Sequence, residues 1–202
     1  MVQYILTESE NYSPGELAQM AIEGGCGWIS LRFPDLDDDE LRAIAAPDIV
    51  DMCREAGVIL TIDDRPALAR DLNVHGVRLS RRFFTDNPSE TPLKIREELG
   101  PEAIIGVETA DSTAPSLLLG ADVDFVTLPA DFSSDQRAAF VDAVRKAEIP
   151  TAIVASGIHT PDQAIEAVAG DGCSGVAVST PIAAAPDPVE RMREFVDALN
   201  VI

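Results

Sequence analysis

Lysine is nearly absent from this sequence, and positive charge is scarce throughout. The 202 residues include two lysines, Lys94 and Lys146, and 15 basic residues in all against 35 acidic ones, which gives a net charge of −20. A surface this negative repels phosphate backbones and anionic lipids. We therefore expect no nucleic-acid or membrane partner, and any anionic ligand must find a local cluster of positive charge.

Cysteine pairs and long apolar runs are also missing. Cys26, Cys53 and Cys173 lie far apart with no CxxC pair, which argues against a disulfide framework or a zinc site and favours three buried thiols. No apolar run is long enough to span a bilayer, and residues 1–6 lack the basic region and long apolar core of a signal peptide. We expect a cytoplasmic protein with a single domain, residues 1–202.

Short apolar runs alternate with helical patterns along the whole chain. Strands are expected at 2–6, 28–32, 59–63, 76–79, 104–107, 124–128, 151–155 and 175–178. Helices are expected at 13–23, 37–56, 66–72, 90–99, 113–119, 134–147, 160–169 and 187–199, with Pro47 breaking the second. Eight strands, each followed by a helix, predict an α/β fold of the (β/α)8 TIM barrel type. An open doubly wound sheet is the alternative, but no glycine-rich turn follows Leu6.

The stretch from Ile59 to Pro66 joins an apolar strand to two carboxylates and an arginine. In a (β/α)8 barrel the active site lies where the strands end at their carboxyl termini. Asp63, Asp64 and Arg65 are therefore candidate catalytic residues. The alternative is that Asp63 or Asp64 simply caps the helix that Pro66 begins.

Arginines gather at the ends of three successive strands in a chain otherwise short of positive charge. They are Arg32, Arg65, Arg81 and Arg82. Guanidinium groups bind phosphates bidentately, so this cluster can clamp an anionic group. The competing interpretation is that some of them form ion pairs at the rim with nearby aspartates, namely Asp35, Asp64 and Asp86.

Small residues follow the last two predicted strands. Ser156 and Gly157 come after the seventh strand, and Ser179 and Thr180 come after the eighth. Barrels of this class commonly hold a phosphate there with backbone N–H groups, and a glycine at position 157 lets the backbone approach the anion. These four residues are predicted to bind a phosphate group.

Several segments, in order along nearly the whole chain, resemble the thiamine phosphate synthase and thiazole tautomerase superfamily. Residues 24–32 are similar to the family's glycine-rich segment ending in Gln-Leu-Arg, and Asp63-Asp64-Arg65 is similar to its Asn-Asp-Arg. The other similar segments are 76–79 (Gly-Val-His-Leu in the family), 105–107, 121–126, 156–158 (Gly-Gly-Ile) and 175–180. The order and spacing of these motifs carry the resemblance.

The resemblance implies an enzyme that joins an aminopyrimidine methyl diphosphate to a thiazole phosphate, with loss of Mg²⁺-bound pyrophosphate. It implies that Arg32 contacts the pyrophosphate, Asp64 binds Mg²⁺ and Asp63 lies where the pyrimidine is held. The thiazole phosphate would be held at Gly157, Ser179 and Thr180. Such chemistry needs no strong base, but it needs a pocket that stabilises the departing pyrophosphate.

The departures from the family pattern fall mainly on the pyrophosphate side. Pro34 replaces a lysine, Ser30 a glutamine and Glu108 a serine, and residues 80–83 replace a segment with a glutamine and a metal-binding aspartate. The loop that follows the sixth strand, residues 128–132, contains no lysine, where the family has one. Charge-assisted contacts contribute about 1.5–3 kcal/mol each, so weak synthase activity is predicted, with Glu108 facing an anion. Arg81 and Arg82 are candidates to stand in for the missing lysines.

Two other functions remain open. The chain could bind a phosphorylated small molecule without catalysis, or it could be an isomerase similar to the thiazole tautomerases. Isomerisation requires a general acid or base, and of the two histidines only His159 follows the end of a predicted strand, whereas His75 precedes one. His159 is otherwise a loop residue beside the cap of the next helix. The sequence does not indicate an oligomeric state.

Overall fold

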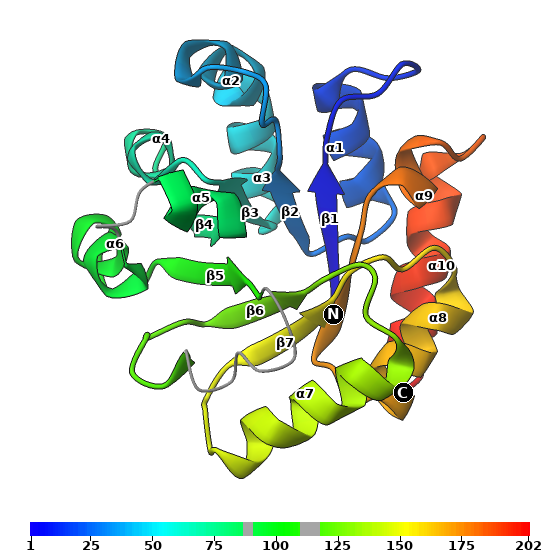
Figure 1. Ribbon diagram of the computed structural model, residues 1–202. Helices are drawn as coiled ribbons and strands as arrows, with labels where there is room; N and C mark the ends of the chain where they lie inside the picture. Colours follow the sequence, from blue (N-terminus) through cyan, green and yellow to red (C-terminus); the bar gives the residue numbers. More distant parts are fainter. Residues whose placement is uncertain (87–90, 110–117) are drawn as a thin grey trace.

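The protein is a closed barrel of parallel strands, which Figure 1 shows from one end. The structure is a computed structural model that describes residues 1–86, 91–109 and 118–202. The strands are β1 (Val2–Leu6), β2 (Trp28–Leu31), β3 (Ile59–Asp63), β4 (Gly76–Leu79), β5 (Ile104–Glu108), β6 (Phe125–Leu128), β7 (Ala152–Ala155) and β8 (Gly175–Val178). Strands that are consecutive in sequence pair with each other, and β8 pairs with β1 to close the barrel. The predicted (β/α)8 TIM barrel is confirmed.

Helices surround the barrel and follow the strands (Figure 1). They are α1 (Pro14–Glu23), α2 (Asp38–Ile44), α3 (Val50–Ala56), α4 (Pro66–Asp71), α5 (Arg81–Asp86), α6 (Pro92–Leu99), α7 (Ser134–Lys146), α8 (Pro161–Ile165), α9 (Thr180–Ala183) and α10 (Pro188–Asn200), with π-helical turns η1 (Ala45–Ile49) and η3 (Glu166–Gly170). In the part of the chain that is described, no helix is both long and apolar enough to cross a bilayer.

The starts and breaks of the helices largely follow the sequence signals. Ser13 and Glu16 form a reciprocal capping box before α1, which satisfies free N–H groups of the first turn. The helix predicted at 37–56 is interrupted around Pro47, as expected. The helix predicted at 134–147 is capped by Ser133: its hydroxyl accepts a hydrogen bond from the Gln136 N–H group, and the Gln136 side chain accepts one from the Ser133 N–H group, so neither residue 134 nor 135 is the cap.

Two further helices differ from the prediction for local reasons. No helical pattern predicts α5, which is a short turn directly after β4. The helix expected at 90–99 begins at Pro92, because Thr91 caps it by accepting a hydrogen bond from the Lys94 N–H group. Most of the helix predicted at 113–119 lies outside the described residues.

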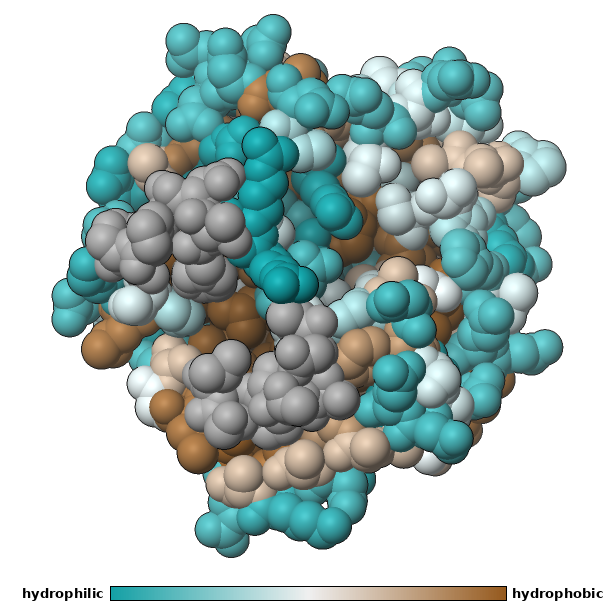
Figure 2. Space-filling model, in the orientation of Figure 1, coloured by the Kyte–Doolittle hydropathy of each residue, from teal (hydrophilic) through white to brown (hydrophobic). Residues whose placement is uncertain are grey.

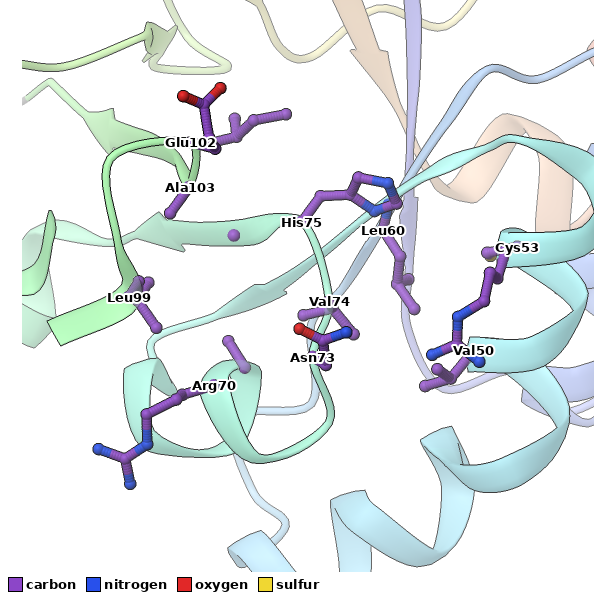
Figure 3. A pocket seen from close by; sticks show the side chains of 14 residues that line it. Val50, Cys53, Leu60, Arg70, Asn73, Val74, His75, Leu99, Glu102 and Ala103 are labelled. Carbon is purple, nitrogen blue, oxygen red and sulfur yellow. The ribbon is translucent and has the colours of Figure 1, made fainter.

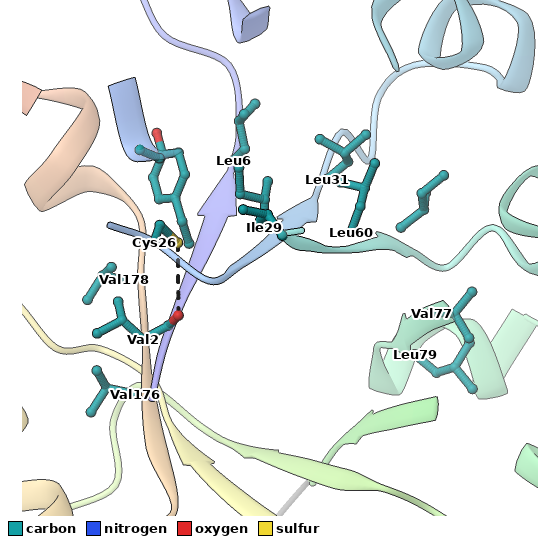
Figure 4. Packing of buried hydrophobic residues seen from close by; sticks show 14 of the residues in the cluster. Val2, Leu6, Cys26, Ile29, Leu31, Leu60, Val77, Leu79, Val176 and Val178 are labelled. Atoms are coloured by element: carbon teal, nitrogen blue, oxygen red, sulfur yellow. Dashed lines mark hydrogen bonds between the residues drawn. The ribbon is translucent and has the colours of Figure 1, made fainter. Parts of the chain in front are cut away.

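Side chains on the strands alternate between the barrel interior and the layer under the helices. The outer layer is apolar, and Figure 4 shows part of it, with Leu6, Ile29, Leu60 and Val77 among the residues drawn. Each such buried side chain stabilises the fold by about 1.5–3 kcal/mol. The three cysteines are buried and unpaired, as predicted.

The barrel interior is filled at its centre by a second apolar cluster. It contains Ile5, Trp28, Phe125, Val154 and Ala177. The rings of Trp28 and Phe125 meet edge to face, 4.6 Å apart and at 84°. Gly106 has no side chain because a Cβ there would lie 2.0 Å from the Phe125 ring. The centre of the barrel, as formed by the described strands, is therefore a packed core and not a channel.

Candidate active site

A pocket of about 730 Å³ opens at the carboxyl ends of β2 to β5. Hydrophilic residues dominate its lining, and Figure 2 shows strongly hydrophilic side chains over the middle of the barrel end. The lining residues are Arg32, Phe33, Pro34, Asp63, Asp64, Arg65, Ser80, Arg81, Arg82, Phe83 and Glu108. The structure therefore brings the four candidate arginines and both candidate aspartates to one pocket.

Asp63 is held at the bottom of this pocket by an arginine that the sequence analysis did not single out. Asp63 and Arg78 face each other across β3 and β4 and are 8% and 2% exposed. The Arg78 Nε–H group donates to both oxygens of Asp63, at 3.1 and 3.0 Å, and its Nη2 also bonds Asp63. The signal for this pair was available, because a charge inside an apolar strand must find a partner when it is buried.

The electrostatics of Arg78 reflect three carboxylates around it. Burial lowers the pKa of Arg78, but the charges of Asp63, Glu108 and Asp64 and the hydrogen bonds that Arg78 donates to Asp63 raise it more, so the net shift is upward. Arg78 is therefore a permanent cation beneath the pocket. It sits at the position of the histidine in the family's Gly-Val-His-Leu segment, and Asp63 sits at the position of the asparagine.

A chain of hydrogen bonds donated by uncharged side chains orients Asp63 from inside the barrel. The Trp28 indole N–H donates to the Thr61 hydroxyl at 3.0 Å, Thr61 donates to the Ser30 hydroxyl at 2.9 Å, and Ser30 donates to Asp63 Oδ1 at 2.8 Å. All four side chains are buried. Because each group in the chain donates toward Asp63, the chain fixes the orientation of its carboxylate.

Asp64 has a separate role from Asp63, although the two are adjacent. Its backbone is left-handed, with φ of 57°, which turns its carboxylate toward the start of α5. One oxygen accepts a 2.6 Å bond from the Ser80 N–H group and the other a 2.5 Å bond from the Ser80 hydroxyl. The N-cap residue of α4 is Arg65, and no side-chain hydrogen bond caps the start of this helix. The alternative in which Asp63 or Asp64 caps that helix is therefore wrong.

The arginines of the pocket differ in how many hydrogen bonds and ion pairs they form with other residues of the protein. Arg65 bonds the Leu36 carbonyl at 3.0 Å and pairs with Asp38 at 2.9 Å, so it fastens the segment that follows β2. The exposed Arg32 side chain makes no hydrogen bond or ion pair with another residue that the structure describes. Arg81 and Arg82 are exposed and lie at the first turn of α5. Arg32 is therefore the guanidinium most available to a ligand.

Glu108 ends β5, is half-buried and lines the pocket. It follows Gly106 by two residues, and Gly106 faces Phe125 in the barrel interior, so Glu108 points to the same interior side. Among the described residues it has no hydrogen-bond or ion-pair partner. Its carboxylate is therefore open to whatever occupies the pocket.

The carboxyl ends of β7 and β8 form a second polar region on the same end of the barrel. Gly157 is left-handed, with φ of 72°, and a Cβ there would lie 2.4 Å from the Ala130 carbonyl oxygen. The Ser156 hydroxyl donates to the Leu128 carbonyl at 2.5 Å. Ser179 and Thr180 begin α9. Glycine at position 157 is thus required by the protein's own backbone, a reason that the sequence alone does not show.

The free backbone donors of this region suit an anion. Among the turn and loop hydrogen bonds of the described residues, none is donated by the N–H groups of Gly157, Ser179 or Thr180. These donors lie after neighbouring strands of the barrel. The four residues predicted to bind phosphate therefore share one region, separate from the arginine-lined pocket.

Neither histidine takes part in these two regions. His159 is exposed beside the cap of α8, where its backbone N–H bonds the Gln163 side chain. His75 Nδ1 accepts a 3.0 Å bond from the Leu60 N–H group at the opposite end of the barrel. It lines a cavity of about 450 Å³ there, drawn in Figure 3 with residues of α3, α4 and α6 around it. His75 directly precedes β4, as the sequence indicated, and therefore lies at the amino-terminal end of the barrel, away from both regions.

The fold and these two regions define the class: a (β/α)8 barrel whose small-molecule site lies at the carboxyl ends of its strands. The sequence matches the profile of a protein family described as "Thiamine monophosphate synthase" over residues 3–182. The chain belongs to this family, and the resemblance found in its motifs is confirmed.

Similar proteins cover nearly the whole length of the chain. A thiamine-phosphate synthase of Bacteroides fragilis is 31% identical, covering 97% of this chain and 98% of the relative. One from Natronomonas pharaonis is also 31% identical, covering 98% and 94%. Among solved structures, a thiamine phosphate pyrophosphorylase of Pyrococcus furiosus superposes with a TM-score of 0.80 at 21% identity, covering 98% of this chain and 95% of the other.

Proposed function

We propose that this protein is a thiamine phosphate synthase, which joins an aminopyrimidine methyl diphosphate to a thiazole phosphate. The observation that carries the proposal is that two regions on one end of a family barrel present groups suited to binding an anion. An arginine-lined pocket lies at β2 to β5, and a set of free backbone donors lies at β7 and β8. A reaction with one diphosphate and one monophosphate substrate needs two such regions.

The chemistry consists of one bond broken and one formed. The bond between the pyrimidine methylene carbon and the diphosphate oxygen breaks, and its electron pair leaves with pyrophosphate. The ring nitrogen of the thiazole then attacks the resulting cation with its lone pair, forming the new C–N bond. Because no proton must be removed for either step, the absence of a histidine from the two described regions is consistent with this reaction.

The pocket residues act on the leaving group. Arg32, which is exposed and uncommitted, would donate hydrogen bonds to the pyrophosphate oxygens, with Arg81 and Arg82 nearby on α5. These guanidinium groups meet the negative charge as it accumulates on the departing oxygen, which is how electrostatic stabilisation lowers a barrier. Arg65 would act at a distance, by fixing the segment that carries Pro34.

The residues present fit a Mg²⁺ ion held partly by the substrate. The described part of the chain contains no cluster of three or more His, Cys, Asp or Glu side chains that could enclose a metal. Asp64 faces the pocket, and each of its oxygens keeps a lone pair beyond the bond to Ser80. Mg²⁺ is often bound by one or two carboxylates together with phosphate oxygens. When bound there, the ion would neutralise charge on the leaving pyrophosphate.

The second substrate would lie at the β7–β8 region. Its phosphate would accept hydrogen bonds from the N–H groups of Gly157, Ser179 and Thr180, while Ser156 keeps the adjoining loop attached to β6. This binding would place the thiazole ring toward the barrel axis, where the pyrimidine is held by the neighbouring pocket. Binding of a phosphorylated ligand without turnover would use the same region, so activity must decide between the two.

The deciding experiment is to incubate the purified chain with both substrates and Mg²⁺ and to measure thiamine phosphate and pyrophosphate in equal amounts. We expect turnover on the order of 1 s⁻¹. An Asp64→Asn variant that folds normally should lose most of this activity. If the native chain binds both substrates but releases no thiamine phosphate, the protein is a binder and the proposal is wrong.

A further inference from the structure

The pocket at β2 to β5 is layered by charge. At its floor, Asp63, Arg78 and Glu108 come from strand positions that face the barrel interior. At its rim, Arg32, Arg81 and Arg82 lie beyond the strand ends. A ligand that spans the pocket therefore meets carboxylates at its deep end and guanidinium groups at its outer end.

The floor carries a net negative charge, and Glu108 supplies it. Arg78 is paired with Asp63 through its Nε and Nη2 atoms, so these two charges offset each other. Glu108 contributes to the field around Arg78 but makes no direct bond with it or with another described residue. A half-buried carboxylate without a partner is costly unless a ligand supplies one.

We propose that Glu108, held beside the Arg78–Asp63 pair, binds the aminoheterocyclic end of the diphosphate substrate and stabilises the positive charge that forms on it. This inference rests on the proposed function, because it assigns a role within the same site. It reverses the prediction from sequence, in which Glu108 faces the pyrophosphate and weakens the enzyme.

The physical reason is the direction of charge separation during the reaction. When the C–O bond breaks, negative charge moves outward with the pyrophosphate, and positive charge remains on the pyrimidine methylene group. The arginines at the rim stabilise the negative charge on the pyrophosphate, and Glu108 stabilises the positive charge on the pyrimidine methylene group. Both interactions strengthen as the bond breaks, so they lower the barrier more than they stabilise the bound substrate.

Arg78 is a positioning residue in this arrangement. Arg78 and Ser30 together keep Asp63 in place. The positive charge of Arg78 also offsets part of the negative charge of the three nearby carboxylates, Asp63, Asp64 and Glu108. The Arg78–Asp63 pair should therefore act as a unit: losing either partner misplaces the floor, whereas a neutral pair restores its net charge. Glu108 would keep its function only when that pair is balanced.

Binding of two partial ligands tests the role of Glu108 directly. The probes are the phosphate-free aminopyrimidine methanol, which reports on the floor, and inorganic pyrophosphate, which reports on the rim. We expect Glu108→Gln to weaken binding of the aminopyrimidine at least tenfold in calorimetry and to leave pyrophosphate affinity within twofold. Glu102→Gln, an exposed glutamate at the opposite end of the barrel, is the matched control and should change neither.

Kinetics provide the second arm. Glu108→Gln should lower kcat about 100-fold, the size of effect typical for removing one preorganised electrostatic group, with the KM for the thiazole phosphate unchanged. If Glu108→Gln or Glu108→Ser instead tightens pyrophosphate binding and raises kcat, Glu108 repels the leaving group and the inference is overturned. If the native chain shows no turnover, the proposed function fails, while the calorimetric arm still decides the role of Glu108.

The pair is tested by a double-mutant cycle. Arg78→Gln and Asp63→Asn alone should each raise the KM for the pyrimidine diphosphate at least tenfold, and the double variant should recover most of that loss. The KM for the thiazole phosphate should stay constant in all three. A purely structural role would predict lower thermal stability with both KM values of the folded fraction unchanged, and that result would overturn the assignment of Arg78 as a positioning residue.

Discussion

The two halves of the active end of this barrel are built from different materials. At β2 to β5 the polar groups are charged side chains, arranged in pairs such as Arg78–Asp63 and Arg65–Asp38. At β7 and β8 they are backbone N–H groups, placed by a glycine that no other residue can replace without strain. A half made of side chains can change by compensating substitutions, whereas a half made of backbone depends on conformation. This explains why the departures from the family pattern fall on the first half.

The largest expected effect comes from breaking the buried pair in the side-chain half. Arg78→Gln leaves Asp63 buried without its cation, so we expect the free energy of unfolding to fall by about 3–5 kcal/mol. Urea denaturation monitored by circular dichroism measures this loss. The double variant with Asp63→Asn should regain most of the stability, since no buried charge is left alone. A double variant as unstable as Arg78→Gln would show that the two residues do not form a unit.

The backbone half is tested by a pair of glycine substitutions with similar backbone angles. Gly157 and Gly57 have φ of 72° and 67°, but only at Gly157 would a Cβ clash, with Ala130. Gly57→Ala should therefore cost about 1 kcal/mol of stability, from the left-handed backbone alone. Gly157→Ala should cost about 3 kcal/mol and abolish binding of inorganic phosphate.

The comparison between these two glycines decides whether the glycine at position 157 is needed for the fold or for binding the anion. Equal losses of stability, with phosphate binding lost only in Gly157→Ala, would favour the original expectation that the glycine serves the anion and not the fold. Phosphate binding that persists in a folded Gly157→Ala protein would place the monophosphate elsewhere. Calorimetry at constant ionic strength measures the binding.

Removing Mg²⁺ should separate the two halves functionally. Pyrophosphate binding at the side-chain half should weaken about tenfold in a chelator, since the ion would bridge Asp64 and the ligand. Phosphate binding at the backbone half should not change. In Asp64→Asn, the metal dependence of pyrophosphate binding should disappear; if it persists, another group holds the ion.

The smallest expected effects distinguish the arginines of the rim. Arg32→Ala removes an uncommitted guanidinium and should weaken pyrophosphate binding about tenfold at low salt, with a smaller loss at high salt. Arg65→Ala should weaken it about twofold, because Arg65 is engaged with Leu36 and Asp38. Titrating pyrophosphate into each variant and into the native protein gives the ratio of their dissociation constants. A larger effect in Arg65→Ala would show that this side chain reaches the ligand itself.

The sequence by itself determined the barrel and the strands that carry the site. Short apolar runs, separated by helix starts such as Ser13-Pro14, leave few alternatives when eight such units follow one another. The end of the barrel that carries the site also follows, because the carboxyl ends of parallel strands share one rim. Asp63, Asp64 and the four arginines of the pocket lining could therefore be assigned to this rim from the sequence, whereas Arg78 could not.

Only the tertiary structure decided what each of these residues does. Whether Asp63 meets Arg78 depends on the register between β3 and β4, which is a property of the closed barrel and not of either strand. Whether Asp64 caps a helix or bonds Ser80 depends on one left-handed backbone angle. The place of Glu108 near Arg78 depends on the register between β4 and β5, which pairs Arg78 with Gly106. Contacts between strands far apart in sequence are set by closure, and no local pattern encodes them.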